Sequence, residues 1–280
     1  MRPDQNPGSP NLPEIPIIAE RYLDEGPRVR VYETADHAIT AMALETVRKL
    51  GQVENPTVLL ATGRTMQPYY QKLLALAHIH RIYGDILRRT TYGHLDNYVY
   101  RPKAYPHGPD ETDFSRTLLR EFIDPLGIHE DHFIPLTGYT DAPEGIARMY
   151  AKGLSLRQIT LVNFGLGPMP EVHIAYMQEG TPFDTDVHYI PRLSEGVIAR
   201  NIHRGENPPT EAITIGHKTY ENAQHIQVLC YGEEKKELLD TALYAEISPQ
   251  IVATGLRRPR VGQVEYFVDS AAFAISATRV

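Results

Sequence analysis

The sequence predicts an α/β fold, with a mostly parallel, doubly wound sheet and helices on both faces. Three observations lead to this fold class. Strand-like and helix-like segments alternate along the chain from residue 28 onward. Several of the strand-like segments are continuous apolar runs, which are typical of strands buried on both faces of a sheet. This order of segments favours parallel strands joined by crossover helices.

The first elements follow from local patterns. Residues 28–33 alternate between polar and apolar side chains and predict a short strand, and 35–51 has apolar residues at helical spacing and ends on a glycine. Residues 56–63 form an apolar run that breaks at a glycine, which predicts a buried strand. Residues 66–84 predict the next helix, and 88–98 predict a strand with polar residues at its end.

The later elements repeat this alternation, and 156–167 is the clearest buried strand in the chain. The further expected strands are 132–137, 211–216, 225–232 and 263–269, and the further expected helices are 115–127, 143–154 and 233–245. A segment rich in proline and polar residues, 101–112, predicts an irregular loop directly after the strand at 88–98. The pattern predicts a single α/β domain over residues 28–280, preceded by a proline-rich N-terminal arm at residues 1–27.

Composition narrows the class of function. The chain has 280 residues, 42% of them hydrophobic and 22% charged, which is ordinary for a globular protein. Its net charge of −7 argues against a general nucleic-acid binder. No apolar run reaches the ~20 residues that span a bilayer, so we expect no membrane partner. Because Cys230 is the only cysteine, no intrachain disulfide can form, and we expect a cytoplasmic protein.

Ligands of open parallel sheets bind beyond the carboxyl ends of the strands, and four segments carry unusual residues there. Gly63, Arg64 and Thr65 join a strand to a helix and could bind an anion, or they could form an ordinary tight turn. Asp96 ends a strand and could act as a base, although a carboxylate in this position is often only a turn or helix cap.

The other two segments are equally open to two interpretations. Glu171 and His173 follow a glycine turn and could form an acid–base pair, or the histidine could be structural. Lys235 begins a helix, where a lysine opposes the helix dipole unless an anion is bound nearby, or it is simply solvated. The histidines and the single cysteine show no metal-binding spacing, so we expect no metal. Gly165 and Gly167 begin like a dinucleotide-binding fingerprint, but its third glycine is missing, so we expect no cofactor.

Together and in this order, the four segments resemble the glucosamine-6-phosphate deaminase/isomerase family, whose nearest relatives are the 6-phosphogluconolactonases. VLLATGRTMQPYYQKL is similar to the phosphate-loop segment of the family, and LDNYVYRPKAYP to its D-E-Y-x-x-x-P segment. GLGPMPEVHIAYMQE resembles G-x-G-x-D-G-H-I-A-F-N-E, and EAITIG with VLCYGEEKK resembles the later strand and lysine-bearing turn. The resemblance implies a Rossmann-like three-layer α/β/α sandwich and a phosphorylated sugar as substrate.

The resemblance also implies a role for individual residues. Asp96 matches the base that moves a proton between C1 and C2 of the sugar, and His173 matches the histidine that opens the ring. Glu171 and Gln178 stand near the positions of two carboxylates that flank this histidine, although Gln178 replaces a glutamate and two extra residues precede His173. Another departure is Asn97, which replaces the glutamate after the base. The residues expected to hold the phosphate are Gly63, Arg64, Thr65, Lys235 and Arg200.

The expected activity is isomerisation and deamination of a 2-amino hexose 6-phosphate by a homo-oligomeric enzyme. The alternatives are a lactone hydrolase similar to 6-phosphogluconolactonase and a non-catalytic sugar-phosphate-binding protein.

Overall fold

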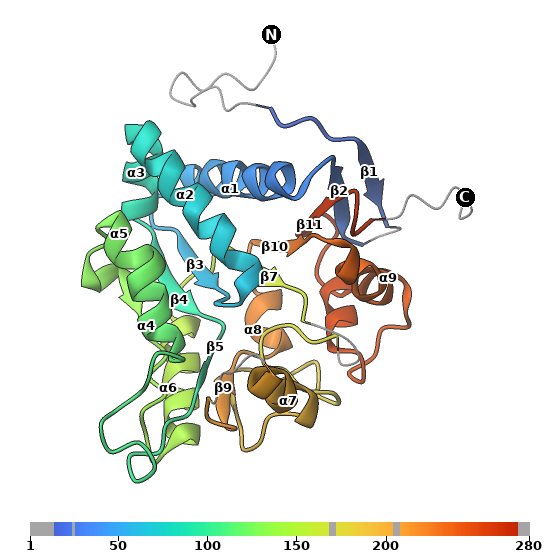
Figure 1. Cartoon of the computed structure of the whole chain (residues 1–280). Coiled ribbons are helices and arrows are strands. Elements are labelled where there is room, and N and C mark those ends of the chain that lie inside the picture. Colours follow the sequence, from blue (N-terminus) through green and yellow to red (C-terminus); the bar gives the residue numbers. More distant parts are fainter. Residues whose placement is uncertain (1–13, 24–25, 168–171, 204–207, 274–280) are drawn as a thin grey trace.

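Figure 1 shows the computed structural model of the chain, which describes residues 14–23, 26–167, 172–203 and 208–273. Its central feature is an eight-stranded sheet in the order β1-β2-β11-β10-β7-β3-β4-β6. Neighbouring strands are parallel except β1 and β2, which are antiparallel. The strands are β1 (Ala19–Tyr22), β2 (Arg28–Tyr32), β3 (Thr57–Leu60), β4 (Thr91–His94), β6 (Phe133–Ile134), β7 (Leu161–Gly165), β10 (His225–Cys230) and β11 (Val264–Asp269).

Helices cover both faces of this sheet, and each face has its own apolar core. On one face pack α1 (Ala35–Gly51), α2 (Gln67–Ile79), α3 (Arg81–Arg88), α4 (Phe114–Leu118) and α5 (Asp124–Leu126). On the other pack α6 (Pro143–Ser155), α8 (His217–Glu221) and α9 (Lys236–Tyr244). Successive β3 residues divide between the cores, because Val58 and Leu60 contribute to the first and Leu59 to the second. The predicted three-layer sandwich is therefore confirmed.

The direction in which strands are added to the sheet reverses between β3 and β7. From β3 the chain adds β4 and β6 on one side, and it then returns to form β7 on the opposite side of β3. The chain next adds β10 and β11 beyond β7. Such a reversal leaves a crevice at the carboxyl ends of the two strands, where α/β proteins of this type bind ligands.

A second, three-stranded antiparallel sheet lies beside the main one. It contains β5 (Asp96–Tyr98), β9 (Ala212–Thr214) and β8 (His188–Ile190). The segment expected as one strand at 88–98 is divided at Leu95, whose N–H donates to Leu60 O of the main sheet and whose C=O accepts from Ile215 N beside β9. Helix α7 (Glu195–His203) packs against the second sheet through a small apolar cluster of its own.

Two expected helices differ from the structure. The helix expected at 66–84 is interrupted at His80, which is extended, so α2 and α3 are separate. The helix expected at 115–127 contains a π-type turn, Leu119–Ile123, between α4 and α5. Pro125 follows that turn, and because proline lacks a backbone N–H it cannot continue regular α-helical bonding there.

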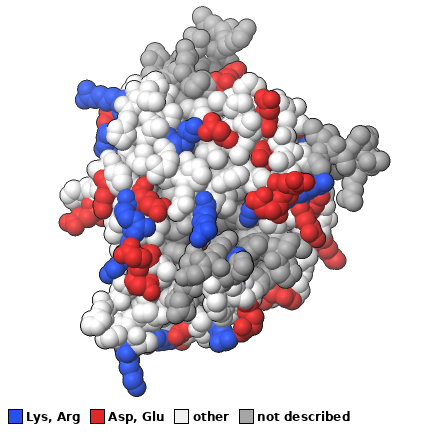
Figure 2. Space-filling model, in the orientation of Figure 1, with Lys and Arg blue, Asp and Glu red and all other residues white. Residues whose placement is uncertain are grey.

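Part of the expected N-terminal arm is regular structure, because Ala19–Tyr22 forms β1 and pairs with β2. An ion pair of 2.6 Å between Glu20 and Arg28 accompanies this pairing, and proline-rich residues 1–13 lie outside the described residues. In the part of the chain that the structure describes, every helix is too short or too polar to span a bilayer. On the face drawn in Figure 2, the coloured basic side chains are interspersed with acidic ones and do not gather into a continuous band.

Candidate active site

A cavity of about 460 Å³ opens at the crevice between β3 and β7. Its wall comes from the segments after these two strands, from β5, from the segment around α4, from α7 and from the turn before α9. The residues that line the cavity include Gly63, Arg64, Thr65, Asp96, Tyr98, Phe114, Leu166, Gly167, His173, Tyr176, Arg200 and Lys235. Seven of the nine residues expected at the site therefore line one cavity.

The segment after β3 forms a compact turn that lines the cavity. Gly63 is extended and precedes the 3₁₀ turn η1 (Arg64–Met66), which is closed by a 2.8 Å bond from Met66 N to Gly63 O. A Cβ atom on Gly165 at the end of β7 would lie 3.3 Å from Thr65 Cβ, so the glycine allows the two segments to pack closely. The turn leads directly into α2, which gives the backbone N–H geometry suited to an anion.

Basic side chains reach the same cavity from two other elements. Lys235 belongs to the 3₁₀ turn η4 (Glu233–Lys235) after β10, and its Nζ donates a 2.6 Å bond to Leu166 O. Arg200 lies on α7 and also lines the cavity. Because Arg64 lines the cavity as well, three segments far apart in sequence bring positive charge to it, an arrangement suited to a phosphate group.

Asp96 is the first residue of β5 and is only 7% exposed. Burial raises the pKa of its carboxyl group from 3.8 to about 7. A carboxyl group with a pKa near neutrality is half ionised at physiological pH, and it can both take and return a proton at little free-energy difference. The cavity that the basic side chains line thus also contains a group suited to general acid–base catalysis.

His173 is held by its backbone against the segment that follows β7. Gly167 N donates a 2.8 Å bond to His173 O, and a Cβ atom on Gly167 would lie 2.4 Å from the imidazole ring. The backbone on both sides is strained, because Val172 and Ala175 have φ angles of 41° and 51°. Strained non-glycine residues are frequent where a loop positions a functional side chain.

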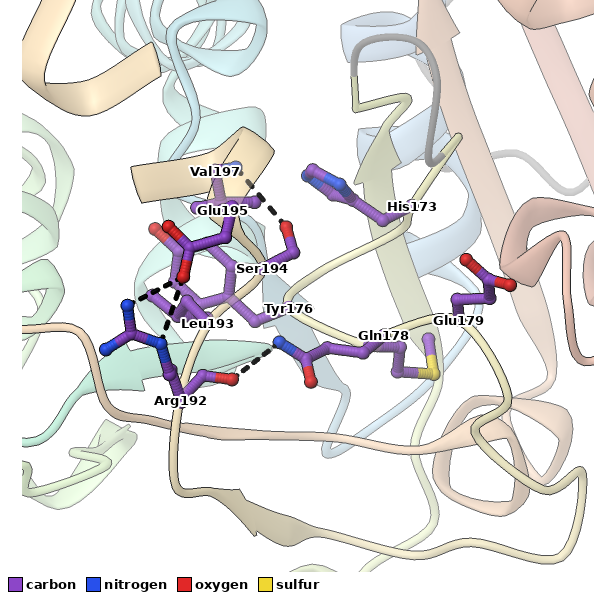
Figure 3. A pocket seen from close by; sticks show the side chains of 10 residues that line it. His173, Tyr176, Gln178, Glu179, Arg192, Leu193, Ser194, Glu195 and Val197 are labelled. Atoms are coloured by element: carbon purple, nitrogen blue, oxygen red, sulfur yellow. Dashed lines mark hydrogen bonds and ion pairs between the residues drawn. The ribbon is translucent and has the colours of Figure 1, made fainter. Parts of the chain in front are cut away.

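Gln178 does not line this cavity but a neighbouring one of about 320 Å³, which His173 and Tyr176 also line. Figure 3 shows the Gln178 side chain pointing toward Arg192, and its Nε2 donates a 2.8 Å bond to Arg192 O. Glu171 lies outside the described residues. Of the two residues expected to flank the imidazole, the structure therefore describes only Gln178, whose amide is bonded to a backbone carbonyl.

Sequence reasoning missed an aromatic wall of the cavity, formed by Tyr98, Phe114 and Tyr176. It noted Asn97 only as a departure from the family, but this buried residue positions the wall. Asn97 Oδ1 accepts from Phe114 N at 3.0 Å, and Asn97 Nδ2 donates to Leu136 O at 2.9 Å. The alternation of β5 could have indicated that Tyr98 shares a face with Asp96, whereas the sequence gives no comparable signal for Tyr176 or Phe114.

No protein-family model matches the chain. Curated relatives include a glucosamine-6-phosphate deaminase of Listeria monocytogenes, 29% identical over 224 residues that cover 77% of this chain and 86% of the relative. Another, from Staphylococcus epidermidis, is 28% identical over 235 residues, covering 82% and 92%.

Among solved structures, a monomeric glucosamine-6-phosphate deaminase superposes with a TM-score of 0.77 at 22% identity, covering 87% of this chain and 98% of that one. The 6-phosphogluconolactonase of Trypanosoma brucei superposes with a TM-score of 0.67 at 19% identity, covering 89% and 98%. The resemblance expected from the motifs is confirmed, and the fold is the one these two groups share.

Proposed function

We propose that this chain, a divergent homologue of glucosamine-6-phosphate deaminases, isomerises and deaminates a 2-amino hexose 6-phosphate. The observation that carries the proposal is one cavity that combines a buried carboxyl group of pKa about 7, Asp96, with basic side chains at a strand-to-helix turn. The curated relatives that are deaminases support the same reaction.

In this proposal the phosphate group binds at the turn after β3. Backbone N–H groups of Gly63, Arg64 and Thr65 and the ammonium group of Lys235 donate to its oxygens, and Arg200 adds a second cation from α7. Lys235 is already oriented by its bond to Leu166 O, so little side-chain entropy is lost on binding. Once the phosphate group is bound there, its position determines how far the carbon chain of the sugar extends toward β5.

His173 and Asp96 carry out the chemical steps. His173 takes the proton of the anomeric hydroxyl group and protonates the ring oxygen, which opens the ring to the aldehyde. Ionised Asp96 then removes the proton from C2 while the aldehyde oxygen gains a proton, and it returns its proton to C1 while the amino group loses one, which gives a C2 imine and a C1 alcohol. Addition of water to the imine releases ammonia and leaves a 2-ketose 6-phosphate, so each turnover consumes one water and one amino sugar.

Hydrolysis of a phosphorylated lactone is the second candidate, favoured by the fold shared with 6-phosphogluconolactonases. The two reactions differ in the proton transfer between carbons, which only the isomerase requires. A buried carboxyl group with a raised pKa supports the isomerase, because its carboxylate is a stronger base for removing a carbon-bound proton. It also argues against a purely sugar-phosphate-binding protein, which has no use for a base of this kind.

The proposal is tested by incubating the protein with glucosamine 6-phosphate and, separately, with 6-phosphogluconolactone. We expect release of ammonia and fructose 6-phosphate from the first, and a loss of at least ~10²-fold in Asp96→Asn. Asp240→Asn is the matched control, since Asp240 is exposed on α9. Lactone hydrolysis without release of ammonia would establish the second candidate instead.

Three expectations from the sequence stay predictions: a cytoplasmic location, assembly into a homo-oligomer, and a single domain over residues 28–280. The buried thiol of Cys230 is compatible with a reducing compartment. Sedimentation of the purified chain measures its assembly directly.

A further inference from the structure

Two tyrosine hydroxyl groups are bonded to each other in the wall of the cavity. Tyr176 Oη donates a short hydrogen bond to Tyr98 Oη, and both residues line the 460 Å³ cavity. Phe114 packs on both rings, nearly parallel to Tyr176 with centroids 5.8 Å apart and tilted against Tyr98 at 5.0 Å. The rings are therefore fixed by packing, and their hydroxyl groups keep one arrangement.

The tyrosine pair is tied to the position of Asp96 through the second sheet. Tyr98 follows Asp96 by two residues on β5, so their side chains leave the same face of the strand with Cα atoms roughly 7 Å apart. Thr214 pairs with Asp96 across β5 and β9, and its Oγ1 accepts a 3.1 Å bond from Tyr176 N. A ligand whose reacting carbons lie at Asp96 therefore extends within reach of the pair.

The direction of the bond between the hydroxyl groups decides what the pair can recognise. Because the Tyr176 proton is directed to Tyr98, the remaining lone pair of Tyr176 Oη is available as an acceptor. Burial raises the pKa of Tyr176 well above 10, so this oxygen stays an uncharged phenol at neutral pH. An uncharged acceptor is suited to a neutral donor such as a sugar hydroxyl group.

The hydroxyl group of Tyr176 is also a departure of this chain from the motif that it resembles. In the segment similar to G-x-G-x-D-G-H-I-A-F-N-E, Tyr176 stands where the resemblance places phenylalanine. The substitution Tyr176→Phe consequently restores the side chain of the resembling motif and keeps the ring that packs on Phe114.

We propose that Tyr176 Oη, oriented by Tyr98, accepts a hydrogen bond from the 3- or 4-hydroxyl group of the substrate and thereby sets which hexose 6-phosphate the site accepts. This inference rests on the proposed function, because it takes a sugar phosphate as the ligand of the cavity. It assigns Tyr176 a role in specificity and leaves proton transfer to Asp96.

The test measures dissociation constants for glucosamine 6-phosphate and for its 3-deoxy and 4-deoxy analogues with otherwise wild-type protein, Tyr176→Phe and the control Tyr83→Phe, each carrying Asp96→Asn so that the sugar is not consumed. Tyr83 is a buried tyrosine of α3 that does not line the cavity. We expect Tyr176→Phe to weaken binding of the parent sugar roughly fivefold, the size of one neutral hydrogen bond. For one of the deoxy analogues the two proteins should bind equally, since the partner hydroxyl group is already missing. Tyr83→Phe should match wild type for all three ligands.

The inference is overturned if the ratio between the dissociation constants of Tyr176→Phe and of the protein with Tyr176 is the same for all three ligands, whether that ratio is one or about five. Failure of the proposed function has a different signature, because the protein with Asp96 intact would then release no ammonia from glucosamine 6-phosphate, whatever it binds. Circular dichroism and thermal unfolding of Tyr176→Phe show whether the fold is retained. A fold-intact variant with unchanged affinity for the parent sugar also contradicts the role.

Discussion

Replacing Asp96 by asparagine should stabilise the fold at neutral pH while removing the proposed base. The pKa of the Asp96 carboxyl group is about 7 in the fold and close to 3.8 when exposed, so the folded state binds its proton more tightly. Below pH 4 the group is protonated in both states and the shift has no effect. Between pH 4 and 7 the unfolded chain ionises first, which lowers the free energy of unfolding, and above pH 7 the loss is complete.

The magnitude follows from the size of the shift. Three pKa units correspond to about 4 kcal/mol, which is an upper bound because the site can admit water when it ionises. Asparagine does not titrate, so the difference in unfolding free energy between Asp96→Asn and wild type should grow by at least about 2 kcal/mol from pH 4.5 to pH 8. All other titrating groups are common to both proteins and cancel in this difference.

Urea unfolding of both proteins at five pH values between 4.5 and 8.5 provides the measurement. Asp240→Asn serves as the control, because its side chain is exposed, and its difference from wild type should not vary with pH. A difference for Asp96→Asn that is constant across the range, or that falls as pH rises, would refute the assignment of a raised pKa and with it the argument for a base at this position.

Three further predictions concern the phosphate site, the histidine and the aromatic wall. Lys235→Met should weaken binding of a sugar phosphate by about tenfold or more and leave binding of the unphosphorylated sugar unchanged, as titration calorimetry would show. Gly167→Ala should lower kcat at least tenfold with normal thermal unfolding, because the added Cβ atom displaces the His173 ring. Asn97→Leu should lower the free energy of unfolding by roughly 2 kcal/mol or more, since the buried Leu136 carbonyl loses a donor.

The residues that sequence reasoning placed in the cavity share a simple local signal. Gly63 and Asp96 each stand where an apolar strand pattern stops, and in a parallel sheet such stops converge at one edge. Lys235 carries the same signal at the end of β10. We could predict that these residues converge because strands that alternate with helices run parallel, so their carboxyl ends lie at the same edge of the sheet.

The positions of Gln178 and Tyr176 depend on the path of an irregular segment. Gln178 bonds the carbonyl of Arg192, and Tyr176 bonds Thr214, contacts that no periodicity encodes. The positive φ angles at Val172 and Ala175 set where these side chains point, and neither residue type signals such a conformation. The break at Leu95 was missed for a related reason, because a strand that changes sheets keeps the same alternation.

Transfer of the C2 proton by Asp96 is the central claim, and deuterium incorporation tests it most directly. Wild type is incubated with glucosamine 6-phosphate in D₂O, and the product is followed by NMR spectroscopy beside Asp96→Asn. The proposed mechanism predicts that wild type forms fructose 6-phosphate at least ~10²-fold faster than the variant, with deuterium at C1 in the fraction of turnovers in which the Asp96 proton exchanges with D₂O before it is returned. Equal rates of product formation and equal labelling in the two proteins would contradict it.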